Sequence, residues 1–386
     1  MTRPSRSAGT LLLVGNYAPD VGFAWWLMEN FWIEFSSVAR EHGMRSLLAY
    51  PQDGAVPNSV SAAGIETAIH PFPGRGVRGL WATISLIRAK NVRCVYFTDR
   101  PFTSPLYAIL RLFGVRLIIN HDHAPGDRPK SSGLTGLLKS GWRRLRPLSC
   151  DLQICVSPLI RARAVATARI PSARVVVVQN GIEPLECSRD RSYLHRALGV
   201  PANKRVCISV GRASPYKRID FIIEVARQCL EDAARPDIVF VHCGDGPDLD
   251  RLRKLALDAG ISDRFFFAGR RSDVRQMLCA SDFAIHASRG EAFSLAILEC
   301  MSAGLAVLVP DIPSVAQAIR NKHTGMVYPD GDASAAARLL CDLTCDPVAS
   351  QRLGAAAAEE VRRHYSLRGM NEQFRVVTRN ALHDRL

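Results

Sequence analysis

The hydrophobic positions of this chain form short aliphatic and β-branched runs that alternate with longer amphipathic segments. In the first half, amphipathic segments predict helices near residues 25–41 and 106–113. The apolar runs that predict strands are residues 10–14, 46–50, 92–98, 115–120, 152–156 and 175–178. Strands that alternate with helices are typical of a parallel sheet with helices on both faces.

A turn and a polar segment separate this half from a second half with the same pattern. Asn180-Gly181 is a turn signal, and residues 182–190 are expected to form a polar linker. Further strands are predicted at residues 206–210, 238–243, 265–267, 283–287 and 306–309, and helices near 219–232, 249–259, 274–278, 295–303, 333–343 and 348–364. The fold class is therefore α/β, with two doubly wound halves that each offer a crevice at the strand ends.

Size and composition agree with a globular protein of two domains. The chain has 386 residues, of which 47% are hydrophobic and 22% charged. Its eleven cysteines are scattered without a C-x-x-C pair, which predicts reduced, buried thiols in a cytosolic protein. We recognise no signal peptide and no apolar stretch of about eighteen residues, so no membrane span is expected.

The net charge of +14 is concentrated in the first half. Residues 1–185 hold 22 Lys and Arg against 11 Asp and Glu, whereas residues 186–386 hold 28 against 25. A basic half suits anionic lipid or a phosphorylated acceptor, and without a nucleic-acid-binding motif we expect no nucleic acid partner. In residues 139–146, Trp142 and Leu145 interleave with four cations, which fits a helix on a membrane surface or a merely solvated amphipathic helix.

Two glutamates eight positions apart are the most informative feature of the second half. Glu291 follows the predicted strand 283–287 on a short loop, and Glu299 lies in the next helix. Ser294 is placed to cap that helix, whose start favours an anion. Two carboxylates beside such a helix start suit a ligand with hydroxyls and phosphates, although two ordinary acids flanking a helix would give the same pattern.

Two glycine-containing loops follow other strands of the second half. Gly211 lets the chain leave its strand, and Arg212 and Lys217 on the same loop suit phosphate oxygens. Gly244 and Gly246 allow a close approach of backbone to a ligand. Plain surface cations and an ordinary turn between strand and helix remain the alternatives for these loops.

In the first half, two strand ends carry candidate residues. His121 ends the strand in Asn120-His-Asp-His123, where its side chain is expected to face a crevice and to bond a sugar hydroxyl or carry a proton. A histidine bonded within its own loop is the alternative. Gly15 opens the loop Gly15 to Asp20 after the first strand and is expected to shape the ligand side of that crevice.

Taken together, these motifs resemble a known family. Gly211-Arg212 with Lys217, Gly244-Asp245-Gly246 and Glu291-x7-Glu299 occur in the order found in retaining glycosyltransferases of family 4, which have the GT-B fold. Val178 to Glu183 is similar to the hinge of that family. The resemblance implies two Rossmann-like domains that face a cleft: an acceptor-side domain at 1–185 and a donor-binding domain at 186–365, with a C-terminal helix at about 366–386 that packs back on the first.

The resemblance also implies roles for the candidate residues. Arg212 and Lys217 would hold the donor diphosphate, Glu291 the sugar hydroxyls and Glu299 the ribose, with His121 near the reacting sugar. The residues expected to line the donor through their backbone are Gly15, Gly211, Gly244, Gly246, Phe293, Ser294 and Leu295. The chain departs from the family at Asn16 to Pro19, where relatives often carry a second glycine.

The implied activity is metal-independent, retaining transfer of a sugar from a nucleoside diphosphate sugar to an acceptor hydroxyl. No cofactor is expected beyond the donor substrate. The expected acceptor is a lipid-linked molecule or a saccharide in polysaccharide, glycolipid or glycoside synthesis, and the expected location is the cytoplasm, at the inner face of the membrane. A nucleotide-sugar epimerase or hydrolase of the same fold, or a non-catalytic nucleotide-sugar-binding subunit, are the alternatives.

Overall fold

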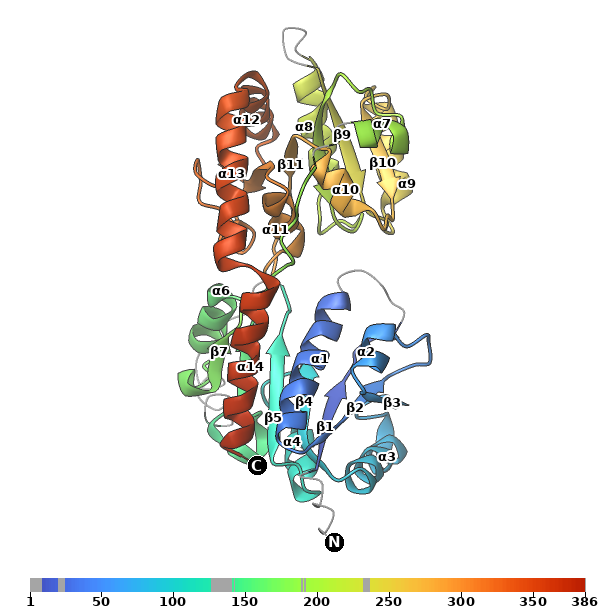
Figure 1. The fold of residues 1–386 in the computed structure, drawn as a ribbon, viewed down its shortest axis with the longest axis vertical. Helices are drawn as coiled ribbons and strands as arrows, with labels where there is room; N and C mark the ends of the chain where they lie inside the picture. Colours follow the sequence, from blue (N-terminus) through green and yellow to red (C-terminus); the bar gives the residue numbers. More distant parts are fainter. Residues whose placement is uncertain are drawn as a thin grey trace. The chain divides into compact units, whose positions relative to one another are not determined.

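The computed structural model describes residues 9–19, 25–125, 141, 143–188, 190, 192–231 and 237–385. Contacts divide the chain into two units, Met1–Gln179 with Met370–Leu386, and Asn180–Gly369. Each unit contains one parallel sheet with helices on both faces (Figure 1), which confirms the predicted α/β fold class. Within the described residues, none of the helices is long and apolar enough to cross a membrane.

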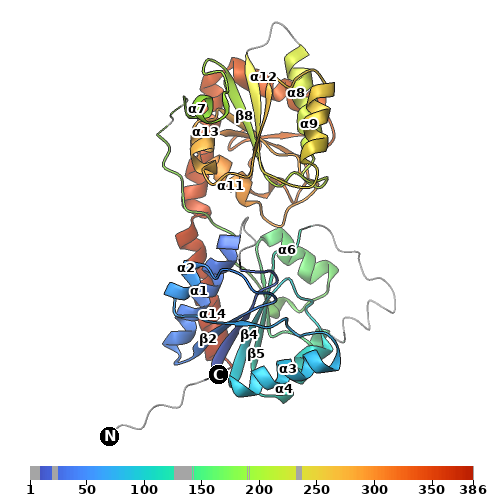
Figure 2. The same ribbon diagram turned by 90° about the vertical axis from the view of Figure 1, so that its right-hand side faces the viewer.

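The sheet of unit 1 has seven strands in the order β3-β2-β1-β4-β5-β6-β7. These strands are β1 Thr10–Val14, β2 Arg45–Tyr50, β3 Glu66–Ile69, β4 Val92–Thr98, β5 Leu117–Asp122, β6 Leu152–Cys155 and β7 Val175–Val177. The helices are α1 Trp25–Glu41, α2 Asn58–Ala62, α3 Gly76–Ala89, α4 Pro105–Leu112, α6 Pro158–Ala162 and α14 Leu367–His383. Figure 2 shows α1, α2 and α14 on one face of this sheet and α3, α4 and α6 on the other.

Helix α14 returns the C-terminal residues to the sheet of unit 1. Phe374 is fully buried, and its ring centroid lies 4.8 Å from that of Phe31 in α1. Asn30 donates a hydrogen bond of 2.7 Å to Asn371, and Arg379 pairs with Glu41 at 2.9 Å. Buried aromatic surface and polar contacts therefore fix α14 beside α1 (Figure 1).

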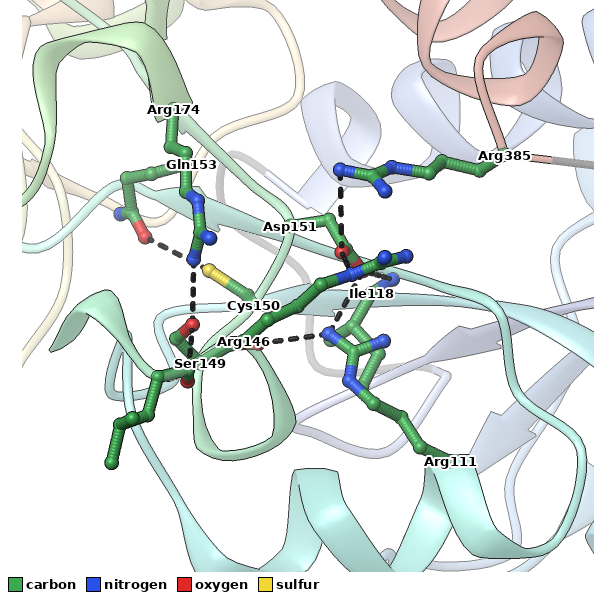
Figure 3. A network of polar contacts seen from close by, with 10 residues as sticks. Arg111, Ile118, Arg146, Ser149, Cys150, Asp151, Gln153, Arg174 and Arg385 are labelled. Carbon is green, nitrogen blue, oxygen red and sulfur yellow. Dashed lines mark hydrogen bonds and ion pairs between the residues drawn. The ribbon is translucent and has the colours of Figure 1, made fainter. Parts of the chain in front are cut away.

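A buried carboxylate, Asp151, joins distant parts of unit 1 at the amino end of β6 (Figure 3). Its Oδ2 atom accepts hydrogen bonds from the Arg111 guanidinium and from the Ile118 backbone N–H, both at 2.9 Å. Arg146 and Arg385 lie 3.4 and 4.0 Å away. Asp151 thus connects α4, β5, the 3₁₀ turn Arg146–Leu148 and the end of the chain.

The sheet of unit 2 has six strands in the order β10-β9-β8-β11-β12-β13. These strands are β8 Arg205–Val210, β9 Ile238–Cys243, β10 Phe265–Gly269, β11 Phe283–Ile285, β12 Ala306–Pro310 and β13 Met326–Tyr328. The helices are α7 Ser192–Leu198, α8 Ile219–Glu231, α9 Leu249–Asp258, α10 Val274–Cys279, α11 Leu295–Ser302, α12 Ala333–Cys345 and α13 Pro347–His364. Helix α8 packs against α9 and α12, and α11 packs against α13.

The segment expected to be a polar linker is instead packed on unit 2. The Ile182 backbone pairs with Tyr365 and Leu367 at 2.9 and 2.8 Å, and the Leu185 N–H donates to Ser302 at 2.7 Å. Gly181 lies so close to Ser366 that an added Cβ would come within 2.5 Å of its carbonyl oxygen. Backbone pairing, which polarity in the sequence does not reveal, therefore holds this segment.

The expectation that all cysteines are reduced is wrong for one pair. Cys187 and Cys279 form a disulfide across 92 residues of sequence, which joins the same segment to α10. Eight of the other nine cysteines are buried, and Cys345 is exposed. The pairing escaped prediction because it depends on where the chain after β7 runs, and not on any spacing of the two cysteines.

Candidate functional site

Three loops meet at the carboxyl edge of the neighbouring strands β9, β8 and β11. Backbone hydrogen bonds of 3.0 Å run from Gly211 to Cys243 and from Ala213 to Asp245. The Arg289 N–H donates to the Tyr216 carbonyl, also at 3.0 Å. The loops that carry the candidate residues of the second half are therefore held together by their own backbones.

Glu291 is the centre of the polar contacts at this edge. Its Oε1 atom lies 2.5 Å from the Lys217 ammonium, 2.6 Å from the Ser288 hydroxyl and 3.0 Å from the His286 ring. Among the residues that the structure describes, no hydrogen bond to Oε2 is found. One oxygen of this carboxylate is thus engaged by the protein, and the other is available to a ligand hydroxyl.

The surroundings of Glu291 keep it ionised. Burial raises its pKa, but the hydrogen bond from His286 and the charge of Lys217 outweigh burial and lower the pKa to about 2. A carboxylate with so low a pKa is a weak base. It can accept hydrogen bonds across the working pH range, but it is poorly suited to remove a proton.

Glu299 lies in α11 without a hydrogen-bond partner among the described side chains, and burial sets its charge. Desolvation raises its pKa to about 7, and the charge of Arg275 only partly opposes this. Burial raises the pKa of Cys243 at the end of β9, and the charge of Glu299 adds to this, so Glu299 lies near that strand end. Glu299 is therefore an unpaired acid at the same edge as Glu291, and its charge changes near neutral pH.

The start of α11 lies between the two acids. Ser294 accepts a hydrogen bond from the Ile297 N–H at 3.4 Å, which confirms the predicted cap. The first N–H groups of any helix, here from Leu295 onward, have no carbonyl partner within it and favour an anion. The Phe293 side chain is buried against Tyr365, so only the backbone of Phe293 is placed to meet a ligand.

The glycines of this edge serve the contact between loops. A Cβ on Gly244 would lie 1.8 Å from the Gly211 carbonyl oxygen, and one on Gly246 would lie 2.2 Å from that of Ala213. Gly211 has a φ of +155° and lies under the Lys217 side chain. Because these glycines have no side chains, the loops pack directly against each other. The sequence had instead suggested that their backbone approaches a ligand.

His121 is buried within unit 1. Its ring is fully buried between Phe31 and Phe374, and its Nδ1 lies 2.7 Å from the Tyr96 hydroxyl on the neighbouring strand. Burial and the nearby His123 hold its pKa well below the usual range, so the ring is neutral. Helices α1 and α14 cover this face of the sheet, which explains why a residue at the end of β5 is buried.

Gly15 is also buried, and its N–H donates a hydrogen bond to the Ala49 carbonyl at 2.9 Å. Asn16 donates to the Thr98 carbonyl at 2.8 Å, which ties this loop to β4, and Tyr17 is exposed. The last residue of the expected loop, Asp20, and the expected membrane residues Lys139 and Trp142 lie outside the described residues.

Sequence reasoning missed two residues of the site, His286 and Ser288. His286 directly follows β11 and is held in place because its own carbonyl accepts a 2.7 Å hydrogen bond from Tyr328. Both residues fix the Oε1 side of Glu291. The available signal was their position, because the carboxyl end of a parallel strand is where ligand-facing side chains gather.

Comparison with known proteins places both halves of the chain in described families. Residues 28–184 match Glycosyltransferase Family 4, and residues 190–360 match Glycosyl transferases group 1. The chain is similar to the N-acetyl-alpha-D-glucosaminyl L-malate synthase of Bacillus anthracis, with 23% identity over 55% of this chain and 56% of the relative. It is also similar to the UDP-Gal:alpha-D-GlcNAc-diphosphoundecaprenol alpha-1,3-galactosyltransferase of Escherichia coli, with 29% identity over 51% of this chain and 50% of the relative.

The matched part spans about half the length of these curated relatives. Among solved structures, HepE of Anabaena in complex with UDP-glucose has a TM-score of 0.74 at 18% identity, over 96% of this chain and 99% of HepE. That likeness shows the fold, in agreement with the two parallel sheets of seven and six strands. The chain therefore belongs to glycosyltransferase family 4, in the group 1 class, and has the GT-B fold.

Proposed function

We propose that this protein transfers a sugar from a nucleoside diphosphate sugar to an acceptor hydroxyl with retention of the anomeric configuration. The observation that carries the proposal is the grouping of Lys217, Glu291, Glu299 and the start of α11 at one sheet edge. Arg212 lies on the same loop as Lys217 and is exposed. Cations and a helix start suit the diphosphate, and the two acids suit hydroxyls.

In this proposal, unit 2 binds the donor. Lys217 and Arg212 neutralise the charge that grows on the diphosphate as the sugar leaves, and such stabilisation is often the largest contribution to catalysis. Because Glu291 already holds Lys217 at 2.5 Å, the ammonium is oriented before a donor binds. Glu291 Oε2 accepts from sugar hydroxyls, and Glu299 accepts from the ribose.

The chemistry of Glu291 supports a retaining step without a protein base. Its pKa of about 2 makes it a poor proton acceptor, and its engaged oxygen disfavours nucleophilic attack. The leaving phosphate is then the nearest strong acceptor for the proton of the incoming hydroxyl. The contact of His121 with the reacting sugar stays part of the proposal, and its buried Nε2 atom forms no hydrogen bond within the described residues.

A donor that contains uridine is the first candidate to test. HepE, whose fold is similar, was crystallised with UDP-glucose, and the similar E. coli enzyme is named for UDP-Gal and a diphosphoundecaprenol acceptor. We propose a lipid-linked or saccharide acceptor at the inner face of a membrane, consistent with the excess of cations over acids in residues 1–185.

A thermal-shift screen of UDP, GDP and ADP sugars tests donor binding, because a ligand that binds the native state raises the melting temperature. One nucleotide series is expected to stabilise the protein, and no shift with any series would contradict a donor site. Incubation of the binding donor without an acceptor separates the rival activities. An isomerised sugar would indicate an epimerase, and rapid release of free sugar would indicate a hydrolase.

A further inference from the structure

Helix α3 of unit 1 presents an apolar face to solvent. Val77 and Trp81 are four residues apart, on one side of the helix, and are 73% and 64% exposed. Ile69, at the end of the neighbouring edge strand β3, is 62% exposed. Single exposed apolar side chains are ordinary, but three in one supersecondary unit indicate a contact surface.

The exposed face of α3 is rigidly built. Thr83 in α3 bonds the His70 ring at 3.0 Å and the Pro73 carbonyl at 2.6 Å, which fixes the helix to the loop after β3. Gly74 and Gly79 pack backbone to backbone, since a Cβ on Gly79 would lie 2.5 Å from Gly74. Val77 and Trp81, one helical turn apart, therefore belong to one fixed surface, which we call the α3 face.

The charged residues of α3 and of the segments that flank it in sequence are all basic. Residues 67–98 contain no acid, and their cations are Arg75, Arg78, Arg88, Lys90 and Arg93. Among the described residues, Lys90 pairs with Glu66, whereas Arg75, Arg78 and Arg88 form no ion pair. A tryptophan and aliphatic side chains surrounded by unpaired arginines are complementary to a surface that is anionic outside and apolar beneath.

We propose that the α3 face binds an anionic membrane, with Val77 and Trp81 among the lipid headgroups and Arg75, Arg78 and Arg88 on lipid phosphates. Indole rings favour the interface between water and hydrocarbon, and each arginine near an anionic surface adds to the attraction. The proposal deepens the membrane part of the proposed function. It assigns that contact to α3, and not to residues 139–146 as the sequence suggested.

The position of α3 fits a membrane-held acceptor. The loop before it lies at the carboxyl edge of the sheet of unit 1, because the His70 N–H donates to the Tyr50 carbonyl at 2.7 Å and Arg100 donates to the Phe72 carbonyl at 2.7 Å. A membrane bound at α3 would thus lie next to the strand ends of this unit, where open α/β sheets bind ligands.

Flotation with lipid vesicles tests the proposal on the full chain. Wild-type protein is expected to float with equimolar phosphatidylcholine and phosphatidylglycerol at low salt, to bind more weakly at high salt, and to remain unbound with phosphatidylcholine alone. The double variant Val77→Ser/Trp81→Ser should reduce partitioning at least about ten-fold. The triple variant Arg75→Gln/Arg78→Gln/Arg88→Gln should reduce it by about five-fold for each arginine.

Matched controls come from exposed positions of unit 2. Leu257→Ser/Val348→Ser removes two apolar side chains that are equally exposed, and Arg338→Gln/Arg352→Gln removes two exposed cations. Neither control should change partitioning. Binding of a nucleotide sugar, measured on the same variants by thermal shift, should be unchanged, so failure of lipid binding and failure of the proposed donor site are separate results.

Three outcomes would overturn the proposal. Wild-type protein that stays unbound with anionic vesicles at low salt would remove the membrane as partner. Binding that survives the α3 variants would place the contact elsewhere on the chain. Dimerisation in sedimentation velocity that Val77→Ser/Trp81→Ser abolishes, in the absence of vesicle binding, would assign the α3 face to a second copy of the chain.

Discussion

Two acids with cationic partners, Asp151 in unit 1 and Glu291 in unit 2, look alike in composition and differ in arrangement. The Asp151 side chain is 3% exposed and uses both oxygens, on Arg111, Arg146 and Arg385 and on a backbone N–H (Figure 3). The Glu291 side chain is 13% exposed, and its contacts with Lys217, Ser288 and His286 all fall on Oε1. The protein thus contacts both oxygens of Asp151 but only one oxygen of Glu291.

The location of the two acids in their sheets explains this difference. Asp151 precedes β6 and so lies at the amino edge of its sheet, whereas Glu291 follows β11 at the carboxyl edge. Parallel α/β sheets bind ligands at the carboxyl edge. A buried carboxylate is therefore assigned a structural role where the protein contacts both of its oxygens. It is a candidate for ligand binding where one oxygen has no partner in the protein.

The largest expected effect on stability is at Asp151. The change Asp151→Ala leaves Arg111, whose side chain is 15% exposed, without its anion, and such losses typically cost roughly 3–5 kcal/mol. All five tryptophans, at 25, 26, 32, 81 and 142, lie in unit 1, so their fluorescence during urea denaturation reports its unfolding. The control Asp53→Ala, at an exposed acid of the same unit, should change the unfolding free energy by less than about 0.5 kcal/mol. An equally small effect at Asp151 would remove its structural role.

The opposite pattern is expected at Lys217. The change Lys217→Ala removes the cation proposed to stabilise the leaving diphosphate, and such donors are worth roughly 3–4 kcal/mol of barrier, a loss of about 10²–10³ in turnover. The tryptophan-monitored unfolding of unit 1 should be unchanged. Lys254→Ala, at an exposed lysine of α9, is the matched control in the transfer assay. Turnover close to that of wild type in Lys217→Ala would contradict the proposed site.

Glu291→Gln is expected to have a smaller effect on transfer. The amide keeps the shape of the side chain but loses the charge, and a hydrogen bond to a charged group is worth roughly 1.5–3 kcal/mol, or about 10–100-fold. Because the contact to the sugar is proposed to strengthen as the sugar leaves, kcat should fall more than donor affinity. A loss that is confined to donor affinity would place Glu291 in ground-state binding alone.

Glu299 differs from Glu291 in how its charge depends on pH. Burial raises its pKa from 4.5 to about 7, so the folded protein keeps a proton that the unfolded chain releases, and the contribution of Glu299 to stability should decline as pH rises through that range. The ionised form accepts ribose hydroxyls, so donor affinity should rise as pH increases from 6 to 8. In Glu299→Gln the contributions of residue 299 to both pH dependences should be lost, whereas those of the buried histidines, which raise stability with pH, should remain. An unchanged pH profile of donor affinity in that variant would separate Glu299 from the ribose. Glu291, with a pKa of about 2, should contribute no change between pH 6 and 8.

The sequence was informative wherever local pattern decides structure. Strand and helix runs, the Ser294 cap and the grouping of Lys217 with Glu291 follow from periodicity and from the rule that loops after parallel strands meet. Helix α3 was missed, because its mixture of glycines, arginines and exposed apolar residues weakens the amphipathic pattern. The exposed apolar residues that weaken the helix pattern are the same residues on which the membrane proposal rests.

Long-range packing decided the features that the sequence could not predict. The burial of His121 depends on α14, which returns to cover β5: its ring stacks on Phe374, 253 residues later in the chain. The Cys187–Cys279 disulfide depends on the path of the segment after β7. The Asp151 network joins residues from 111 to 385, and no local spacing points to it.

Calorimetric titration of the stabilising nucleotide sugar into wild-type protein, Lys217→Ala and Asp151→Ala tests the central claim most directly. If Glu291 and Lys217 bind the donor and Asp151 only stabilises unit 1, Lys217→Ala should weaken donor binding at least about ten-fold. Folded Asp151→Ala should bind within about two-fold of wild type. Equal affinities in wild type and Lys217→Ala, or a weakening found only in Asp151→Ala, would contradict the account.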